Sequence, residues 1–227
     1  EISMPLGEKL QNNRLPQHVM LFLSFLLLTW LSSVFETSEL RTTPWKPETG
    51  LAVAAGLLLG RPAILTVALG ILVSTRLWGW PLPGIWEYVS AAVRTLTFTG
   101  TAIAASSILL RHSTPTLHTA LIFLAFSFTL TVFYAFVRLP LLWLGVHIEP
   151  DYIWSYTVTL SIGNLLGILT IVPLFMVRDG WEAIIAFLRG WTLYHWLALA
   201  GLVVVSFVVF GIKEIDQFKF FYLVFLP

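Results

Sequence analysis

The chain has 227 residues, of which 57% are hydrophobic and only 11% are charged, and its formal net charge is +1. Soluble domains carry about 25% charged residues, so this composition excludes a soluble protein and indicates an integral membrane protein. The sequence has no basic run that could bind nucleic acid. It has no cysteine, which excludes disulfides, thiolate metal sites and cysteine nucleophiles.

Apolar segments divide the chain and predict an all-α integral membrane protein, a bundle of about eight transmembrane helices with the eighth truncated. The predicted segments are 18–35, 47–60, 62–80, 84–110, 117–144, 152–177, 194–212 and 218–227. The stretch 181–191 has charges near both ends and predicts an interfacial helix. Residues 1–17 are expected to form a cytoplasmic N-terminal segment, and residues 18–227 a helical membrane domain whose C-terminal end is missing.

The second segment is short for a membrane crossing. Residues 45–60 would measure about 24 Å as a helix, against roughly 30 Å of hydrocarbon core. Pro47 suits the first helical turn, and Glu48 complements the positive end of the helix. Trp45 and Lys46 stand where interfacial anchors belong, so Glu48 is expected at the outer surface.

Two pairs of glycines are spaced four residues apart. Gly56 and Gly60 form one pair, and Gly163 and Gly167 form the other. Small residues at this spacing allow helix backbones to approach closely. We therefore expect all four glycines to lie at close helix–helix contacts.

Loop charges favour a cytoplasmic N-terminus. With this orientation the inner loops would hold slightly more Lys and Arg than the outer loops. The acidic residues of the loops would gather on the outer side, in agreement with it.

Polar residues form one stripe on each of the fourth, fifth and sixth segments. Arg94 and Arg138 are charges at membrane depth, which cost at least about 2.5–3.5 kcal/mol unless they are paired or hydrated. Both should point into the bundle, with Glu87, Glu48 or a bound anion as partner. Alternatively, each arginine only holds the helices in register, and Arg138 could also snorkel to the interface. Asn164 is either an interhelical hydrogen-bonding residue or a ligand contact.

These residues predict one polar pocket that opens toward the outer face. Its candidate residues are Arg94, Glu87, Arg138, Glu48, Asn164 and Trp45. A cleft of this kind suits a small anionic ligand or the acidic surface of a partner. The histidines lack metal-ligand spacing and no catalytic motif is present, so no cofactor or metal is expected.

The stretch PWKPETGLAVAAGLLLGRPAILTVALGILV, residues 44–73, resembles the signature of the membrane-associated sensor domain family, type one (the MASE type-one domain). The matching residues are Trp45, Pro47, Gly50, Gly60, Arg61 and Gly70. In the sixth segment, GNLLGILTIVP is similar to the family's Gly-Asp-x-x-Gly pattern, although Asn164 stands in place of the usual acid. The fourth segment departs from the family too, with Arg94 or Thr95 where an Asn is common.

The resemblance implies about eight helices that feed a cytoplasmic output domain, such as a two-component histidine kinase or a diguanylate cyclase. It implies a sensory domain in the bacterial inner membrane, and whether the full-length protein is an enzyme stays open. Candidate partners are membrane lipid, a second copy of the chain and another membrane protein, because similar domains of hexose-phosphate signalling kinases work with a transporter-like partner. The alternatives are a small-molecule carrier, the substrate-binding subunit of one, or a structural subunit of a membrane complex.

Overall fold

The computed structural model describes residues 14–34, 43–78, 82–109, 117–146, 150–176 and 192, and this part of the chain is all-α. Its helices are α2 (Arg14–Val34), α3 (Pro47–Leu59), α4 (Ala63–Leu77), α5 (Ile85–Thr95), α6 (Thr101–Leu109), α7 (Leu117–Val146) and α8 (Pro150–Met176). A π-helical turn, η1 (Leu96–Gly100), joins α5 and α6 into one continuous helix. The first six predicted segments are confirmed as helices. The last two segments and the predicted interfacial helix lie outside the described residues.

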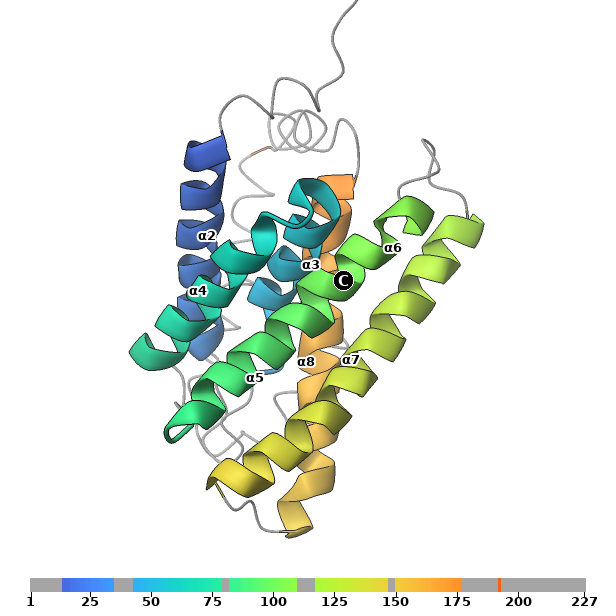
Figure 1. Ribbon diagram of the computed structural model, residues 1–227. Helices are drawn as coiled ribbons and strands as arrows, with labels where there is room; N and C mark the ends of the chain where they lie inside the picture. The colour runs from blue at the N-terminus through green and yellow to red at the C-terminus, as the bar shows by residue number, and fades with distance from the viewer. Residues whose placement is uncertain are drawn as a thin grey trace, which may run out of the picture.

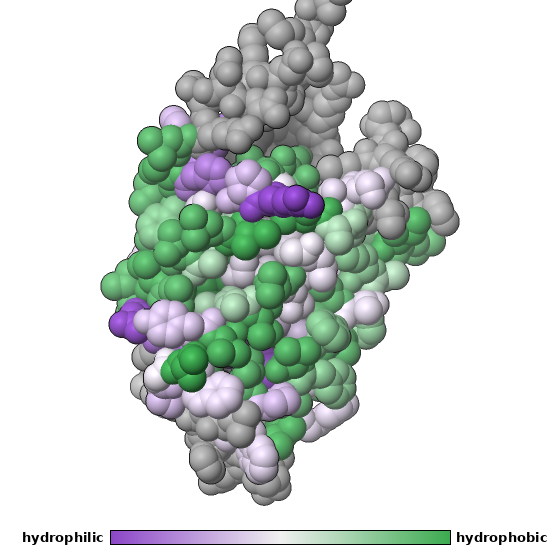
Figure 2. Space-filling view, viewed as in Figure 1, coloured by the Kyte–Doolittle hydropathy of each residue, from purple (hydrophilic) through white to green (hydrophobic). Residues whose placement is uncertain are grey.

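Three helices are long and apolar enough to cross a membrane: Leu15–Val34, Leu121–Leu141 and Ile153–Phe175. Their length and composition make the chain a multi-pass membrane protein. Many of their large apolar side chains are exposed, and Figure 2 shows a molecular face that is mostly hydrophobic. Such a surface suits lipid rather than water. The helices α3 and α4 are shorter apolar helices.

Successive helices run in alternating directions along the bundle (Figure 1). The turn between α3 and α4 therefore lies at one end, which we name the α3–α4 end. The close of α4 at Leu77 and the start of α5 at Ile85 lie at the opposite end, which we name the α4–α5 end. The predicted orientation would place the α3–α4 end in the cytoplasm.

The helix α3 lies at the centre of the described bundle and contacts α2, α4, α6, α8 and η1. Every residue from Pro47 to Leu57 is buried. With 13 residues, α3 is about 20 Å long and does not reach across a hydrocarbon core of roughly 30 Å. It is therefore a half-length helix enclosed by longer ones.

The beginning of α3 lies beside the middle of α8. The backbone N–H of Lys46 donates to the carbonyl of Gly163 at 3.0 Å, about halfway along α8. The prediction that Glu48 begins its helix at the outer surface is therefore wrong, because Glu48 is only 2% exposed. The half-buried Trp45 donates from Nε1 to the hydroxyl of Thr170 on α8 at 2.9 Å.

Close backbone contacts fix the position of α3. A Cβ atom at Gly163 or Gly167 would collide with the carbonyl oxygens of Thr43 and Lys46, respectively. These glycines therefore admit the non-helical residues 43–46 to the surface of α8.

The other predicted pair of glycines behaves differently at its two positions. A Cβ atom on Gly56 would lie 2.6 Å from the carbonyl oxygen of Thr99, so α3 and η1 touch there. The prediction for Gly60 is wrong, because no atom lies within 4 Å of a Cβ placed there. Gly60 instead ends α3 with a φ of 65°, a left-handed conformation that glycine adopts without steric cost.

Replacing Gly167 with Ala tests the contact between α8 and residues 43–46. We expect the free energy of unfolding to fall by about 1–3 kcal/mol, because the added methyl group collides with backbone that cannot rotate away. Thermal or denaturant unfolding in detergent measures the change. Gly100→Ala is the matched control, because its nearest contact is 3.8 Å away and it should be neutral or stabilising. Equal effects of the two substitutions would contradict the packing described.

Candidate functional site

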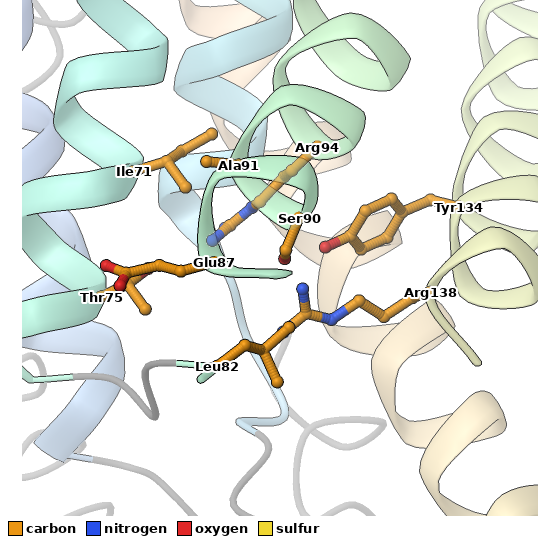
Figure 3. A pocket seen from close by; sticks show the side chains of 9 residues that line it. All are labelled: Ile71, Thr75, Leu82, Glu87, Ser90, Ala91, Arg94, Tyr134 and Arg138. Carbon is orange, nitrogen blue, oxygen red and sulfur yellow. The ribbon is translucent and has the colours of Figure 1, made fainter. Parts of the chain in front are cut away.

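A small polar pocket lies between α4, α5 and α7 toward the α4–α5 end (Figure 3). Its volume is about 40 Å³, and roughly 10–15 Å³ is needed for one water molecule. The lining residues are Ile71, Thr75, Leu82, Glu87, Ser90, Ala91, Arg94, Tyr134 and Arg138. Three of the predicted site residues, Glu87, Arg94 and Arg138, thus border one cavity.

Glu48 does not line the pocket but reaches it through Arg94. Arg94 Nη2 lies 2.9 Å from Glu48 Oε1, and the exposed fractions of the two side chains are 16% and 2%. The prediction left Glu87, Glu48 and a bound anion open as partners of Arg94, and the structure pairs Arg94 with Glu48. Removing one member of such a buried pair leaves an uncompensated charge, which costs far more than the loss of a surface pair.

Thr49 extends this ion pair to α8. Arg94 Nη2 also donates to Thr49 Oγ1 at 3.3 Å, and Thr49 Oγ1 donates to Asn164 Oδ1 at 2.8 Å. Asn164 is fully buried, so it makes the interhelical hydrogen bond that was one of its two predicted roles. We name Glu48, Thr49, Arg94 and Asn164 the buried network; it connects α3, α5 and α8.

Two atoms of the buried network have no hydrogen-bond partner within the described part of the chain. They are Glu48 Oε2 and Asn164 Nδ2. When one oxygen of a buried carboxylate has no hydrogen-bond partner, the stability of the carboxylate depends strongly on a cation beside the other oxygen. Arg94 therefore supplies the positive charge beside the buried Glu48 carboxylate.

Glu87 is held by Arg76, a residue that the sequence analysis did not select. Arg76 Nε and Nη2 donate to the two carboxylate oxygens at 2.9 and 3.0 Å. Arg76 is 62% exposed and Glu87 only 5%. The sequence could have indicated this pair, because Arg76 lies in the last turn of α4 and Glu87 in the first turn of α5. The short connection between the two helices brings these turns together.

Arg138 makes no ion pair with any carboxylate among the described residues. The phenol group of Tyr134 lines the same cavity, and Tyr156 lies close enough to Arg138 to interact with it. In Figure 3 its guanidinium group points into the pocket, toward the hydroxyl groups of Ser90 and Tyr134. The side chain therefore points inward and does not snorkel.

The remaining candidate, Trp45, does not line the pocket.

Phe98 of η1 packs against Tyr134 with ring centroids 4.8 Å apart, which holds the phenol ring beside the pocket. Thr99 of η1 donates to the carbonyl of Ala52 on α3 at 3.1 Å. The π-helical turn therefore ties one wall of the pocket to α3, and π-helical turns are frequent at functional sites.

Comparison of the chain with protein-family models, with curated proteins and with solved structures gives no match. The resemblance to the membrane-associated sensor domain family therefore stays a prediction that rests on its motif residues.

A double-mutant cycle on Glu48 and Arg94 tests the buried network. Arg94→Gln should lower the free energy of unfolding by about 3–5 kcal/mol, because it leaves the Glu48 carboxylate buried without a partner. Glu48→Gln together with Arg94→Gln should recover much of that loss, which denaturant unfolding in detergent would show as a large coupling energy. Arg61→Gln, on the exposed turn between α3 and α4, is the control and should change stability by less than about 0.5 kcal/mol. Additive effects of the two substitutions would show that the pair does not stabilise the bundle.

Proposed function

We propose that this chain is the sensory domain of a bacterial signal-transduction protein in the inner membrane. Its N-terminus faces the cytoplasm, and it relays a stimulus to a cytoplasmic output domain. The observation that supports this function is the position of Arg94, which lines the pocket and also holds Glu48 of the central helix. One side chain thus belongs both to a cavity and to the packing of α3.

The arrangement supplies a physical route for a signal. A ligand or partner that interacts with Arg94 from the pocket competes with Glu48 for the same guanidinium group. The equilibrium between two packings of α3 then shifts. The size of the shift is set by the difference in the ligand's affinity for the two packings. Because α3 packs along α8 through Gly50 and Gly167, a displacement of α3 acts on α8. In the proposed orientation α8 ends on the cytoplasmic side.

A carrier would differ from a sensor in the accessibility of the pocket. A carrier exposes its site alternately to the two faces of the membrane. The described pocket lies toward one end, and the buried helix α3 occupies the centre of the bundle. Accessibility from each face therefore separates a sensor from a carrier.

Single cysteines can measure this accessibility, because the natural chain has none. Ser90→Cys places a thiol in the pocket, and Arg61→Cys and Pro83→Cys mark the two ends of the bundle. An impermeant thiol reagent should label positions 83 and 90 only in right-side-out vesicles, and position 61 only in inside-out vesicles.

Each other labelling pattern contradicts a specific part of the proposal. Labelling of position 90 from both sides would favour a carrier. A pocket cysteine that reacts from neither side would contradict an outward-facing sensory site. Exchange of the patterns at positions 61 and 83 would reverse the orientation and would exclude a cytoplasmic output domain after the eighth predicted segment.

A further inference from the structure

The charges around the pocket do not cancel among the described residues. Glu87 is held by Arg76, and Glu48 is held by Arg94. Arg138 adds a third positive charge, and no described carboxylate lies within ion-pair distance of it. A cationic group that is enclosed by helices in a membrane interacts strongly with any anion that reaches it, because little water screens the two charges.

The pocket also supplies hydrogen-bond donors in an arrangement that fits an oxyanion. Arg138 and Arg94 contribute guanidinium groups from α7 and α5, and Ser90, Tyr134 and Thr75 contribute hydroxyl groups. Figure 3 shows Arg138, Ser90 and Tyr134 directed toward one another across the cavity. A guanidinium group matches the two oxygens of a carboxylate or phosphate with two parallel hydrogen bonds.

The size of the pocket limits the ligand. Its volume of about 40 Å³ holds only a few non-hydrogen atoms, and the apolar side chains of Ile71, Leu82 and Ala91 form part of its wall. A small anion fits as a whole, whereas a larger molecule could insert only its charged group. Both a free anion and the headgroup of an anionic lipid meet this condition.

We propose that the pocket binds the oxyanion group of a carboxylate or phosphate ligand, with Arg138 as its main anchor and Arg94 shared between the ligand and Glu48. The inference rests on the proposed function for its biological meaning, since the oxyanion would be the stimulus. The binding itself is independent of signalling.

Thermal unfolding of the purified chain in dodecyl maltoside micelles tests the proposal, because this detergent carries no anionic group. Sodium phosphate and sodium acetate are titrated separately against sodium chloride at constant ionic strength and pH 7. At least one of the two anions should raise Tm with a saturable dependence on concentration. Arg138→Gln should weaken the apparent affinity at least tenfold, and the control Arg61→Gln should leave it unchanged. Arg138→Lys keeps the charge without the planar guanidinium group, so it should bind more weakly than the wild type even if Arg138→Gln fails to fold.

A second arm separates the two sources of the oxyanion. Phosphatidylglycerol is added to the same micelles, with phosphatidylcholine as the comparison. If a lipid headgroup occupies the pocket, phosphatidylglycerol should raise the Tm of the wild type but not that of the Arg138 variants, and it should abolish the shift caused by free anions. The proposal fails if neither free anions nor phosphatidylglycerol gives a saturable shift, or if the Arg138 variants respond like the wild type. Such a failure would leave the one-sided access of position 90, and with it the proposed sensory function, intact.

Discussion

The ion pair between Glu48 and Arg94 is the interaction on which the rest of this bundle depends. It places a carboxylate in the first turn of α3, where the N-terminal end of the helix is positive, and a guanidinium group beside it. Glu48 is therefore stabilised both by the helix end and by Arg94. The N-terminus of α3 can thus lie beside the middle of α8, at a depth where an isolated carboxylate would be unstable.

The short length of α3 follows from this placement. Residues 43–46, which precede α3, are not helical, so they place backbone N–H and carbonyl groups inside the bundle. Non-helical backbone is tolerated at membrane depth only where protein covers it and satisfies its polar groups. Gly163 and Gly167 provide the cover by allowing close approach, and the Gly163 carbonyl accepts the N–H of Lys46. Thus the glycine contacts and the ion pair support the same unusual position of α3.

Hydropathy was sufficient to predict the six described helical segments, because each is an apolar run between polar or proline-containing turns. The inward direction of Arg94 also followed from the cost of a charge in lipid. The depth of Glu48 could not be predicted in this way. A short apolar segment is compatible both with a helix that crosses a thinned bilayer and with a half-length helix. The π-helical turn η1 was not predicted; in the structure it packs against α3. Gly60 failed as a packing residue because the same spacing also occurs where a glycine ends a helix.

The three described arginines of this end of the bundle differ in how strongly they can respond to an anion. Arg76 is 62% exposed, so water and salt screen its charge and an added anion would gain little there. Arg94 is largely enclosed but already balanced by Glu48. Arg138 points into the same cavity, and no carboxylate in the described part of the chain forms an ion pair with it. In the proposed binding mode, an anion that enters interacts first with Arg138 and then competes for Arg94. The energy of binding at α7 would in this way weaken the ion pair that holds the first turn of α3.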